Sequence, residues 1–356
     1  MEIVVGAPHS APNGLLDQGL VEIFSGASGG LLYTRSGLGA GDNFGRSVTG
    51  IGDINLDGTE DVLIGALSSL NGQHFRGAFH VLSGASGTWI HQVFANTTFS
   101  ENSLGFCAAP LGDIDLDGVP DFIVGAPFAS PGGSFTDIGM ARVYSGLDAT
   151  ALMDLEGEAS HMKFGKSVAS VDDADHDGVR GILIGSPYGY DFALEEDDRH
   201  GSATLVSGAT GEVMHRWFGA DPHDHLGEAV ASLGDPDADG HPDFLLGSPR
   251  DGAIGQVPSA GFVQAYDYSP SLEVSTYTMS VSAGGVQDLT IDFPTAMANS
   301  PYLVVFSREP SGIQIVPGIP LALDDMFLDS VQGIYTFSTR SGLQEYRYPF
   351  RPSGKG

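Results

Sequence analysis

Four short acidic loops hold the residues whose types and spacing most clearly indicate chemistry. They begin at Asp53, Asp113, Asp173 and Asp235 and follow the pattern Asp-x-Asp/Asn-x-Asp-Gly-x-x-Asp, with one departure in the third loop. Oxygen donors at alternate positions suit Ca²⁺, which takes about six to eight hard oxygen ligands. The glycine permits the sharp turn that folds the loop round an ion. The residue after each glycine can offer its carbonyl, and these residues are Thr59, Val119, Val179 and His241.

The loops differ from the helix-flanked EF-hand loop, which begins in the same way but requires a glutamate at its twelfth position. Here the twelfth residues are Ile64, Val124, Ile184 and Leu246, and each lies in an apolar run. That excludes an EF-hand and predicts a calcium loop at a β-hairpin. Two alternatives stay open: solvated acidic turns that hold no metal, and metals whose role is purely structural.

The whole chain is acidic, with a net charge of −30 from 45 acidic and 15 basic residues. Nucleic acids and anionic membrane surfaces both require clustered lysine and arginine, so neither is an expected partner. No apolar stretch is long enough for membrane insertion. Cys107 is the single cysteine, so the chain forms no internal disulfide.

Each loop belongs to a unit of about sixty residues that recurs along the chain. Before the loops stand FGRSV, LGFCA, FGKSV and LGEAV; after them stand LIGAL, IVGAP, LIGSP and LLGSP. A third element then reads GAFHVLSG, GMARVYSG, GSATLVSG or GFVQAYDY. The first 30 residues match the last two elements of a further copy, so the first unit is incomplete.

Each unit is predicted to form four short strands: the FGxSV stretch, the run after the loop, the VxSG stretch and a last strand such as GTWIHQVFA. Short apolar or alternating runs between glycine turns are typical of strands, and helical spacing is absent. The fold class is therefore all-β, a β-propeller of four-stranded antiparallel blades with about five blades present. A solenoid of helical pairs is the alternative fold. It agrees with the length of the repeat but not with the absence of helical spacing.

The combination of FG, GD-x-D-x-D-G and GAP resembles the FG-GAP repeat of integrin α-subunit propellers and of secreted bacterial proteins. The resemblance implies Ca²⁺ on one face of the propeller, in up to four sites. Carried over by position, it implies these side-chain ligands: Asp53, Asn55, Asp57 and Asp61; Asp113, Asp115, Asp117 and Asp121; Asp173, Asp175 and Asp177; Asp235, Asp237, Asp239 and Asp243.

The third loop departs from the pattern, because its ninth position is Gly181 and Arg180 stands beside it. It lacks one carboxylate and has a cation nearby. We therefore expect the third calcium site to be the weakest, completed by water or by Asp172.

The domain organisation follows from the repeats. We expect a propeller over residues 1–269, a small β-sandwich-like domain over 270–350 that resembles the C-terminal β modules of secreted repeat proteins, and a disordered tail over 351–356. The repeats lie near 1–36, 44–99, 104–156, 164–219 and 226–268. Since Met1 is followed at once by repeat sequence and no leader is seen, we expect a chain cut short at its start, either an open fragment or a smaller ring than the seven blades of integrins.

Outside the repeated positions, catalytic groups are sparse. His215, His223, Asp224 and His225 form the densest histidine cluster, which could hold zinc or lie in a surface loop. No G-x-S-x-G motif is present. Cys107 aligns with Ser47, Ser167 and Ala229, so a small-residue packing slot is expected there. Trp89 and Trp217 are predicted to occupy equivalent positions in the last strands of two units, as packing residues.

Two functions from different classes remain. The first is a calcium-binding, non-catalytic adhesion or recognition module for extracellular protein or glycan ligands, located outside the cell or at its surface, as the resemblance implies. The second is the propeller scaffold of a secreted hydrolase or lyase that acts on polysaccharide or phosphoester. Fold alone does not choose between them. The unique residues form no catalytic set, which favours binding.

Overall fold

The computed structural model describes residues 2–67, 77–95, 102–131, 137–189, 200–220, 224–238, 240–249, 261–266, 268, 302–306, 313–317, 336–337 and 346–347. The chain divides into two compact units. The first comprises Met1–Ser232 with Leu246–Gly261, and the second comprises Leu233–Leu245 with Phe262–Gly356. The predicted domain boundary after residue 269 stays a prediction.

Five antiparallel sheets follow one another along the chain, and each is called a blade here. Blade 1 holds β1 (Glu2–Ala7), β2 (Leu20–Ser25) and β3 (Leu31–Ser36). Blade 2 holds β4 (Val48–Gly52), β5 (Asp61–Ala66), β6 (Ala78–Leu82) and β7 (Trp89–Phe94). Blade 3 holds β8 (Cys107–Gly112), β9 (Asp121–Ala126), β10 (Met140–Tyr144) and β11 (Ala151–Glu156). Blade 4 holds β12 (Ser167–Val171), β13 (Gly181–Ser186), β14 (Ser202–Val206) and β15 (Val213–Phe218). Blade 5 holds β16 (Ala229–Gly234), β17 (Asp243–Ser248) and β18 (Phe262–Tyr266).

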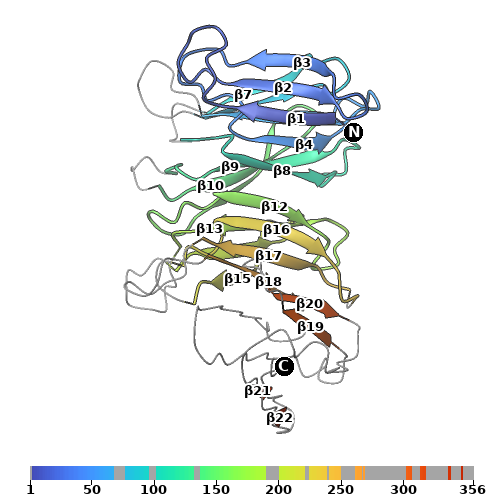
Figure 1. The fold of residues 1–356 in the computed structure, drawn as a ribbon, viewed down its shortest axis with the longest axis vertical. Helices are drawn as coiled ribbons and strands as arrows, with labels where there is room; N and C mark the ends of the chain where they lie inside the picture. Colours follow the sequence, from blue (N-terminus) through green and yellow to red (C-terminus); the bar gives the residue numbers. More distant parts are fainter. Residues whose placement is uncertain are drawn as a thin grey trace, which may run out of the picture. The chain divides into compact units, whose positions relative to one another are not determined.

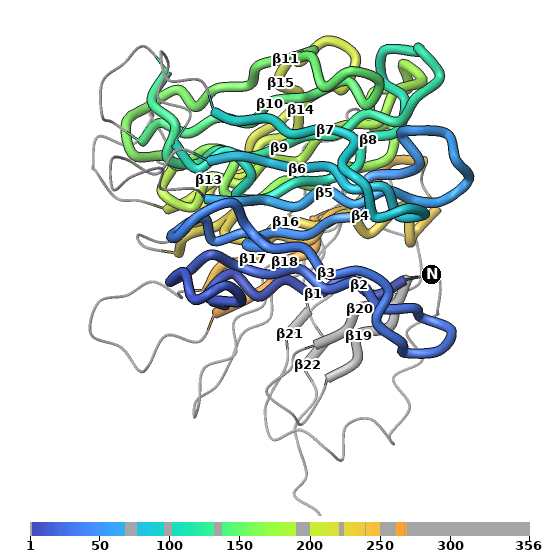
Figure 2. Tube along the Cα trace, turned by 90° about the horizontal axis from the view of Figure 1, so that it is seen from above, coloured from blue at the N-terminus to red at the C-terminus, as the bar shows by residue number. Residues whose placement is uncertain are grey.

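The all-β prediction is confirmed, and each complete blade has its four strands in sequence order. Figure 2 shows β4, β5, β6 and β7 running side by side. Figure 1 shows β1, β4, β8 and β12 one after another, and β8 contacts both β4 and β12. In the part of the chain that the structure describes, no strand of blade 1 takes the place that β4 holds in blade 2, as the incomplete first repeat predicts. Among the described strands, blade 5 likewise has three.

The second strand of each complete blade is buried along its whole length. All six residues of β5, β9 and β13 are buried. A strand covered on both faces reads as a continuous apolar run, which explains VLIGA and FIVGA. The outermost strands are more open: β7 has only exposed and half-buried residues. The cores therefore lie between neighbouring blades: Val21 and Ile23 of blade 1 pack with Val62 and Ile64 of blade 2.

The FG and GAP glycines meet across each blade–blade contact. A Cβ on Gly65 of blade 2 would lie 1.9 Å from the carbonyl oxygen of Gly105 in blade 3, so only glycine fits. Gly105 also has a φ of 89°, which favours glycine. The same close approach joins Gly6 to Gly45, Gly125 to Gly165 and Gly185 to Gly227.

The Phe–Gly pairs precede their strands, which corrects the expectation that FGxSV forms one strand. Phe44 makes an isolated parallel bridge with Gly19 of the preceding blade, and Phe164 makes the same bridge with Gly139. The first strand of blade 2 then begins at Val48. The motif is therefore a connection between blades.

The predicted small-residue slot is present, and it is also a hydrogen-bond donor. Ser47 Oγ donates to the Gly105 carbonyl at 2.8 Å, and Ser167 Oγ donates to the Gly227 carbonyl at 2.9 Å. Cys107 Sγ takes the same place 3.2 Å from the Gly165 carbonyl. Desolvation raises the pKa of the Cys107 thiol to about 12, so the thiol stays protonated and can donate.

The second unit contains two further strand pairs. β19 (Tyr302–Phe306) pairs with β20 (Ile313–Pro317), and β21 (Thr336–Phe337) pairs with β22 (Tyr346–Arg347). The sequence PYLVVFS, which begins at Pro301 and is typical of a strand, contains β19, and the strand-like sequence GIYTFST, which begins at Gly333, contains the short β21. The stretch from Ser271 alternates apolar and polar residues round an Ala-Gly-Gly turn, which predicts strands; this stretch and the predicted disordered tail lie outside the described residues. The β-sandwich stays a prediction. No helix among the described residues is long and apolar enough to cross a membrane.

Candidate metal centre

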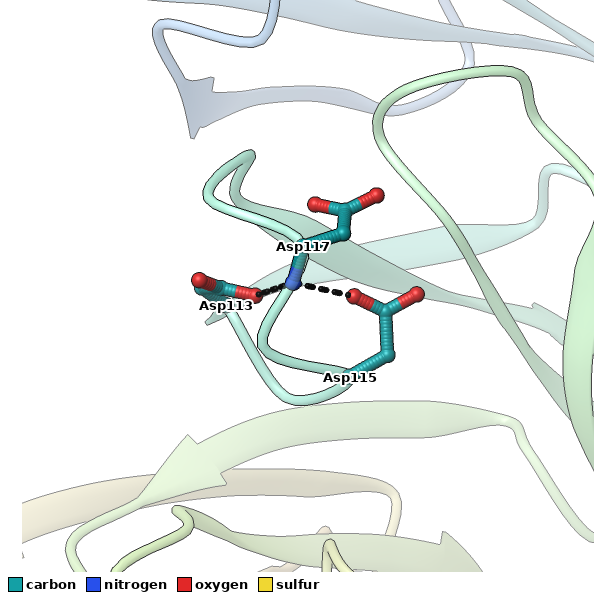
Figure 3. A group of neighbouring side chains, drawn as sticks. All are labelled: Asp113, Asp115 and Asp117. Carbon is teal, nitrogen blue, oxygen red and sulfur yellow. Dashed lines mark hydrogen bonds between the residues drawn. The ribbon is translucent and has the colours of Figure 1, made fainter.

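The second loop joins β8 to β9 and gathers three carboxylates. One oxygen from each of Asp113, Asp115 and Asp117 lies within 4.8 Å of the others, and all three side chains are exposed. Two oxygens bound to one Ca²⁺ at about 2.3–2.6 Å can be no more than about 5 Å apart. The separation therefore fits one shared ion. Figure 3 shows the three side chains round the turn, with two of them directed at one backbone nitrogen.

Backbone amides hold this arrangement. The N–H of Asp117 donates to Asp113 Oδ1 and to Asp115 Oδ1, both at 3.1 Å. The N–H of Gly118 donates to Asp113 Oδ2 at 2.9 Å. Leu116 and Gly118 have positive φ values of 62° and 95°, which turn these amides inward. The loop thus positions its carboxylates through the backbone, and their mutual repulsion is the part that a cation would relieve.

The ninth carboxylate does not join the cluster. Asp121 is fully buried and accepts hydrogen bonds from the N–H groups of Ile114 at 2.9 Å, Asp115 at 3.4 Å and Gly146 at 3.0 Å. Gly146 belongs to the turn between β10 and β11. Asp121 therefore ties the loop to a hairpin of the same blade, and its predicted role as a ligand stays a prediction.

The first loop, between β4 and β5, repeats this geometry with an amide in place of one carboxylate. The N–H of Asp57 donates to Asp53 Oδ1 at 2.9 Å and to Asn55 Oδ1 at 3.0 Å. Asp61 accepts from Ile54 and from Gly84, at 2.9 and 3.1 Å. With Asn55 neutral, one fewer of the predicted ligand positions in this loop carries a charge than in the second loop.

Burial raises the pKa of Asp61 above its ordinary value, and the nearby charge of Asp57 adds to the rise, although backbone hydrogen bonds from Gly84 and Ile54 oppose it. Burial raises the pKa of Asp121 in the same way, with Asp115 as the neighbouring charge. The surroundings therefore destabilise the ionised form of each buried carboxylate. A cation bound in the same loop would stabilise that ionised form.

The third loop, between β12 and β13, gathers Asp173, Asp175 and Asp177 in a similar cluster. Gly181 offers no side chain, so the amides of Ala174 and Gly208 lose the acceptor that Asp121 provides in blade 3. Arg180 Nη2 lies 3.1 Å from Asp172 Oδ1. Asp172 is thus paired with the cation beside the loop, which argues against the expectation that it completes the site.

The fourth loop lies in the second unit. The N–H of Gly240 donates to Asp235 Oδ2 at 3.0 Å, the same contact that Gly118 makes in the second loop. Asp243 is buried, as Asp61 and Asp121 are. Asp237 and His241 are described, whereas the predicted ligand Asp239 lies outside the described residues.

The N–H groups of Thr59, Val119 and Val179 donate to the aspartate two positions earlier, at 3.0, 2.8 and 2.8 Å. Whether their carbonyls, and that of His241, bind the ion stays a prediction.

Two loop contacts were missed by sequence reasoning. Ser83 Oγ donates to Asp57 Oδ2 at 3.1 Å, and Ser207 Oγ donates to Asp177 Oδ2 at 3.3 Å. Both serines belong to the third repeated element, which reads GAFHVLSG in blade 2 and GSATLVSG in blade 4. The recurrence of a serine directly before a glycine at the end of the third strand of each complete blade is the signal that sequence offers.

The histidine cluster does not form a metal site within the described part of the chain. There, the two loop clusters are the groupings of three or more potential ligands. His215 lies in β15 with its ring 4.5 Å from that of Trp217, and burial lowers its pKa. His225 packs on Tyr188, with ring centroids 4.6 Å apart. His223 lies outside the described residues.

The strand register corrects the assignment of Trp89 and Trp217 to equivalent positions. Trp89 pairs with Leu82, whereas Trp217 pairs with Ala203. The residue of β15 that corresponds to Trp89 is Val213.

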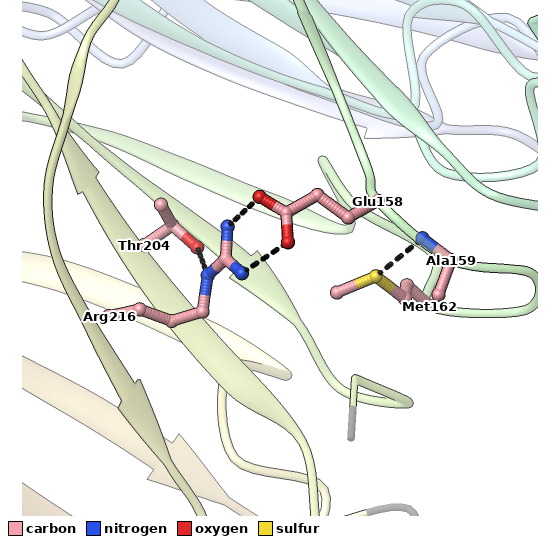
Figure 4. A network of polar contacts seen from close by, with 5 residues as sticks. All are labelled: Glu158, Ala159, Met162, Thr204 and Arg216. Atoms are coloured by element: carbon pink, nitrogen blue, oxygen red, sulfur yellow. Dashed lines mark hydrogen bonds and ion pairs between the residues drawn. The ribbon is translucent and has the colours of Figure 1, made fainter. Parts of the chain in front are cut away.

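A polar network fixes the connector between blades 3 and 4. The two guanidinium Nη atoms of Arg216 donate to the Glu158 carboxylate at 2.8 and 2.9 Å, and Arg216 Nε donates to Thr204. Figure 4 shows this fork and the amide of Ala159 directed at Met162 Sδ. Each of the four nitrogen donors thus has an acceptor within the network, which indicates a structural role.

Comparison with known proteins gives one consistent relationship. No family model matches the chain. Integrin alpha-5 of Xenopus laevis is 25% identical over 242 residues, which cover 61% of this chain and 21% of that protein. Integrin alpha-V of Gallus gallus is 31% identical over 162 residues, 44% of this chain and 15% of that protein. Human integrin alpha-7 is 32% identical over 192 residues, 52% of this chain and 16% of that protein.

The chain therefore spans about a fifth or less of the length of these relatives. Among solved structures, the Dos1 propeller aligns with a TM-score of 0.41 and 8% identity, covering 73% of this chain and 53% of that one. The mitotic checkpoint complex aligns with a TM-score of 0.42 and 10% identity, covering 73% and 58%. The repeated sequence, the successive four-stranded blades and the integrin matches together identify the repeat region as an integrin α-like β-propeller.

Proposed function

We propose that the chain is a calcium-binding, extracellular recognition module that binds a protein or glycan ligand without catalysis. The observation that supports it is the position of the carboxylate clusters. They lie at the hairpin loops of a repeated unit, in a chain that is similar to integrin α subunits.

In this proposal Ca²⁺ is bound by the carboxylates of Asp113, Asp115 and Asp117 and their counterparts in the other loops. The ion offsets the repulsion between carboxylates that share a turn. Because the loop is tied to the neighbouring hairpin through Asp121, a rigid loop also fixes that end of the blade. Binding to the folded state alone adds stability by mass action. Up to four ions are proposed, with the third site weakest.

The proposal is tested by probing immobilised protein against arrays of extracellular proteins and of glycans, in about 1 mM Ca²⁺, the range of extracellular calcium modules, and in EDTA. We expect ligand binding that depends on Ca²⁺ and produces no turnover. The matched control is the Asp113→Asn/Asp115→Asn variant, which loses two carboxylates from one loop. Release of product from a polysaccharide or phosphoester panel, abolished by changing His223 and His225, would support the enzyme instead.

A further inference from the structure

The outermost strand of blade 2 makes a polar contact with blade 3. The Nε2 atom of His91, in β7, lies 2.9 Å from the carbonyl oxygen of Gly146. A carbonyl oxygen only accepts, so Nε2 carries the proton and donates the hydrogen bond. Gly146 belongs to the turn between the third and fourth strands of its blade, here called the rim turn, which comprises residues 83–88 in blade 2, 145–150 in blade 3 and 207–212 in blade 4. Blade 2 therefore holds the rim turn of blade 3 through a side chain.

The second acidic loop holds the same glycine through its other polar group. The N–H of Gly146 donates to Asp121 Oδ1 at 3.0 Å, and a Cβ on Gly146 would lie 1.9 Å from the carbonyl oxygen of Pro120, the eighth residue of that loop. Asp121 Oδ2 accepts in turn from the N–H groups of Ile114 and Asp115. An unbroken series of contacts thus leads from β7 of blade 2 to the backbone of Asp115, one of the predicted ligands.

Blades 1 and 2 are joined in the same way. Tyr33 occupies in β3 the register position that His91 occupies in β7. Its hydroxyl donates to the carbonyl of Ala85 in the rim turn of blade 2. In the same turn, the N–H of Gly84 donates to Asp61 at 3.1 Å. A donor from the preceding blade and the ninth carboxylate of the loop therefore meet at the rim turn in both blade 2 and blade 3.

The contact between blades 3 and 4 differs at both of these points. Met153 takes the register position of His91 and carries no N–H or O–H group in its side chain. It still reaches the rim turn of blade 4, because a Cβ on Gly211 would lie 2.9 Å from Met153 Sδ. The third loop has Gly181 where the first two loops have an aspartate. The side-chain donor and the ninth carboxylate are thus present together in two contacts and replaced together in the third, which indicates that they act as one unit.

We propose that His91 is a positioning residue for the calcium site of the following blade. Through Gly146 and Asp121 it holds the backbone of the second loop in the conformation that binds the ion. The inference rests on the calcium binding proposed above. A loop that is already held in its binding conformation loses less conformational freedom when the ion binds, so its affinity is higher. Tyr33 has the same role for the first loop.

The coupling acts in both directions. If the His91 contact raises the affinity of the second loop for Ca²⁺, the bound ion strengthens the contact between blades 2 and 3 by the same factor, because coupling between binding free energies is reciprocal. Ion binding therefore ties successive blades together at their outer rim as well as closing one loop.

The test is isothermal titration calorimetry of the folded full chain with Ca²⁺. Asp113→Asn/Asp115→Asn removes the second site, so the binding that this variant loses relative to the wild type belongs to that site. His91→Phe keeps a ring in β7 and removes the N–H donor. We expect His91→Phe to weaken the second site about fivefold, the lower end of coupling between sites. In the Asp113→Asn/Asp115→Asn background it should leave the remaining binding unchanged.

Two further variants separate positioning from packing. The side-chain NH₂ of a glutamine can donate as the imidazole does, so His91→Gln should retain most of the wild-type affinity. Gln92→Ala removes a neighbouring contact of the same strand, in which Gln92 Nε2 lies 3.2 Å from His80 Nδ1 within blade 2, and should leave the second site unchanged. Thermal unfolding supplies the reciprocal measurement: His91→Phe should lower the melting temperature more in Ca²⁺ than in EDTA. Circular dichroism checks that each variant is folded.

The positioning role would be overturned by a folded His91→Phe variant whose second site binds Ca²⁺ as tightly as that of the wild type. It would also be overturned if His91→Gln or Gln92→Ala weakened that site as much as His91→Phe does, since the donor would then not be the cause. A wild-type chain that loses no binding on Asp113→Asn/Asp115→Asn substitution would overturn the proposed calcium site itself, which is a different outcome from failure of the coupling alone.

Discussion

The carboxylate of Asp121 accepts a hydrogen bond from the backbone N–H of Gly146 at 3.0 Å, and so joins the second acidic loop to the β10–β11 turn. Its other oxygen accepts from Ile114 and Asp115. The same contacts join Asp61 to Gly84 in blade 2. The ninth carboxylate of the motif therefore has a structural role that exists before any ion is bound.

Asp121→Asn should destabilise the protein even without calcium. An asparagine has one acceptor oxygen, so its NH₂ group must face an N–H donor on one side of the carboxamide. Leaving a buried donor unsatisfied costs about 1–3 kcal/mol, and urea unfolding in EDTA measures it. Asp175→Asn is the matched control, since Asp175 is exposed and should change stability by less than about 0.5 kcal/mol. Equal losses in the two variants would contradict the structural role of Asp121.

The raised pKa values of Asp61 and Asp121 predict a pH dependence of known sign. Both are raised above 3.8, so the folded state binds these protons more tightly than the unfolded state. Their favourable contribution is complete below pH 3.8 and is lost as pH rises through the folded values. In EDTA, the stability of the wild type relative to Asp61→Asn/Asp121→Asn should therefore increase as pH falls from 7 towards 4. Urea titrations across this range test it, and a flat or falling difference would be inconsistent with raised values.

Gly65→Ala should disrupt the contact between blades 2 and 3. The added Cβ would lie 1.9 Å from the carbonyl oxygen of Gly105, which is backbone and cannot rotate away. Overpacking of this severity should cost at least about 3 kcal/mol. Gly30→Ala is the control, because its nearest neighbour is the Ser28 hydroxyl at 3.3 Å and its φ is not positive. Thermal unfolding of both variants would show whether the cost belongs to the blade contact or to any glycine change.

Cys107 should tolerate serine and reject valine. Ser47 and Ser167 already make the equivalent hydrogen bond, so Cys107→Ser should change stability by less than about 0.5 kcal/mol. Cys107→Val adds volume beside Gly125 and should cost about 1–3 kcal/mol. With a pKa raised to about 12, the native thiol should also resist alkylation at pH 8 and react once the chain is unfolded. Rapid labelling of the native protein would show that the thiol is not desolvated.

The strands were predictable from sequence. Burial of β5, β9 and β13 on both faces leaves a continuous apolar run in each, and the same run recurs in successive repeats. The acidic clusters were predictable for the same reason, since the spacing of Asp113, Asp115 and Asp117 within one loop fixes their proximity.

The contacts between distant residues were not predictable in this way. The position of Asp121 in the motif predicts a metal ligand. The hydrogen bond from the Gly146 amide depends on how a separate hairpin packs, and the motif carries no information about that. Phe44 was placed in a strand because its bridge to Gly19 depends on how two blades pack. Trp89 and Trp217 lie in equivalent strands, and only the register of β7 and β15 shows that their positions differ.

The most direct test of the whole account is a thermal melt of the chain during a Ca²⁺ titration, with Mg²⁺ and EDTA as controls. A melting temperature that rises with Ca²⁺ and not with Mg²⁺, and rises less in Asp113→Asn/Asp115→Asn, is the predicted result, because oxygen clusters in flexible loops favour the larger ion. A folded protein whose melting temperature does not change with Ca²⁺ concentration would contradict the account, since the loops would then be acidic turns that hold no metal.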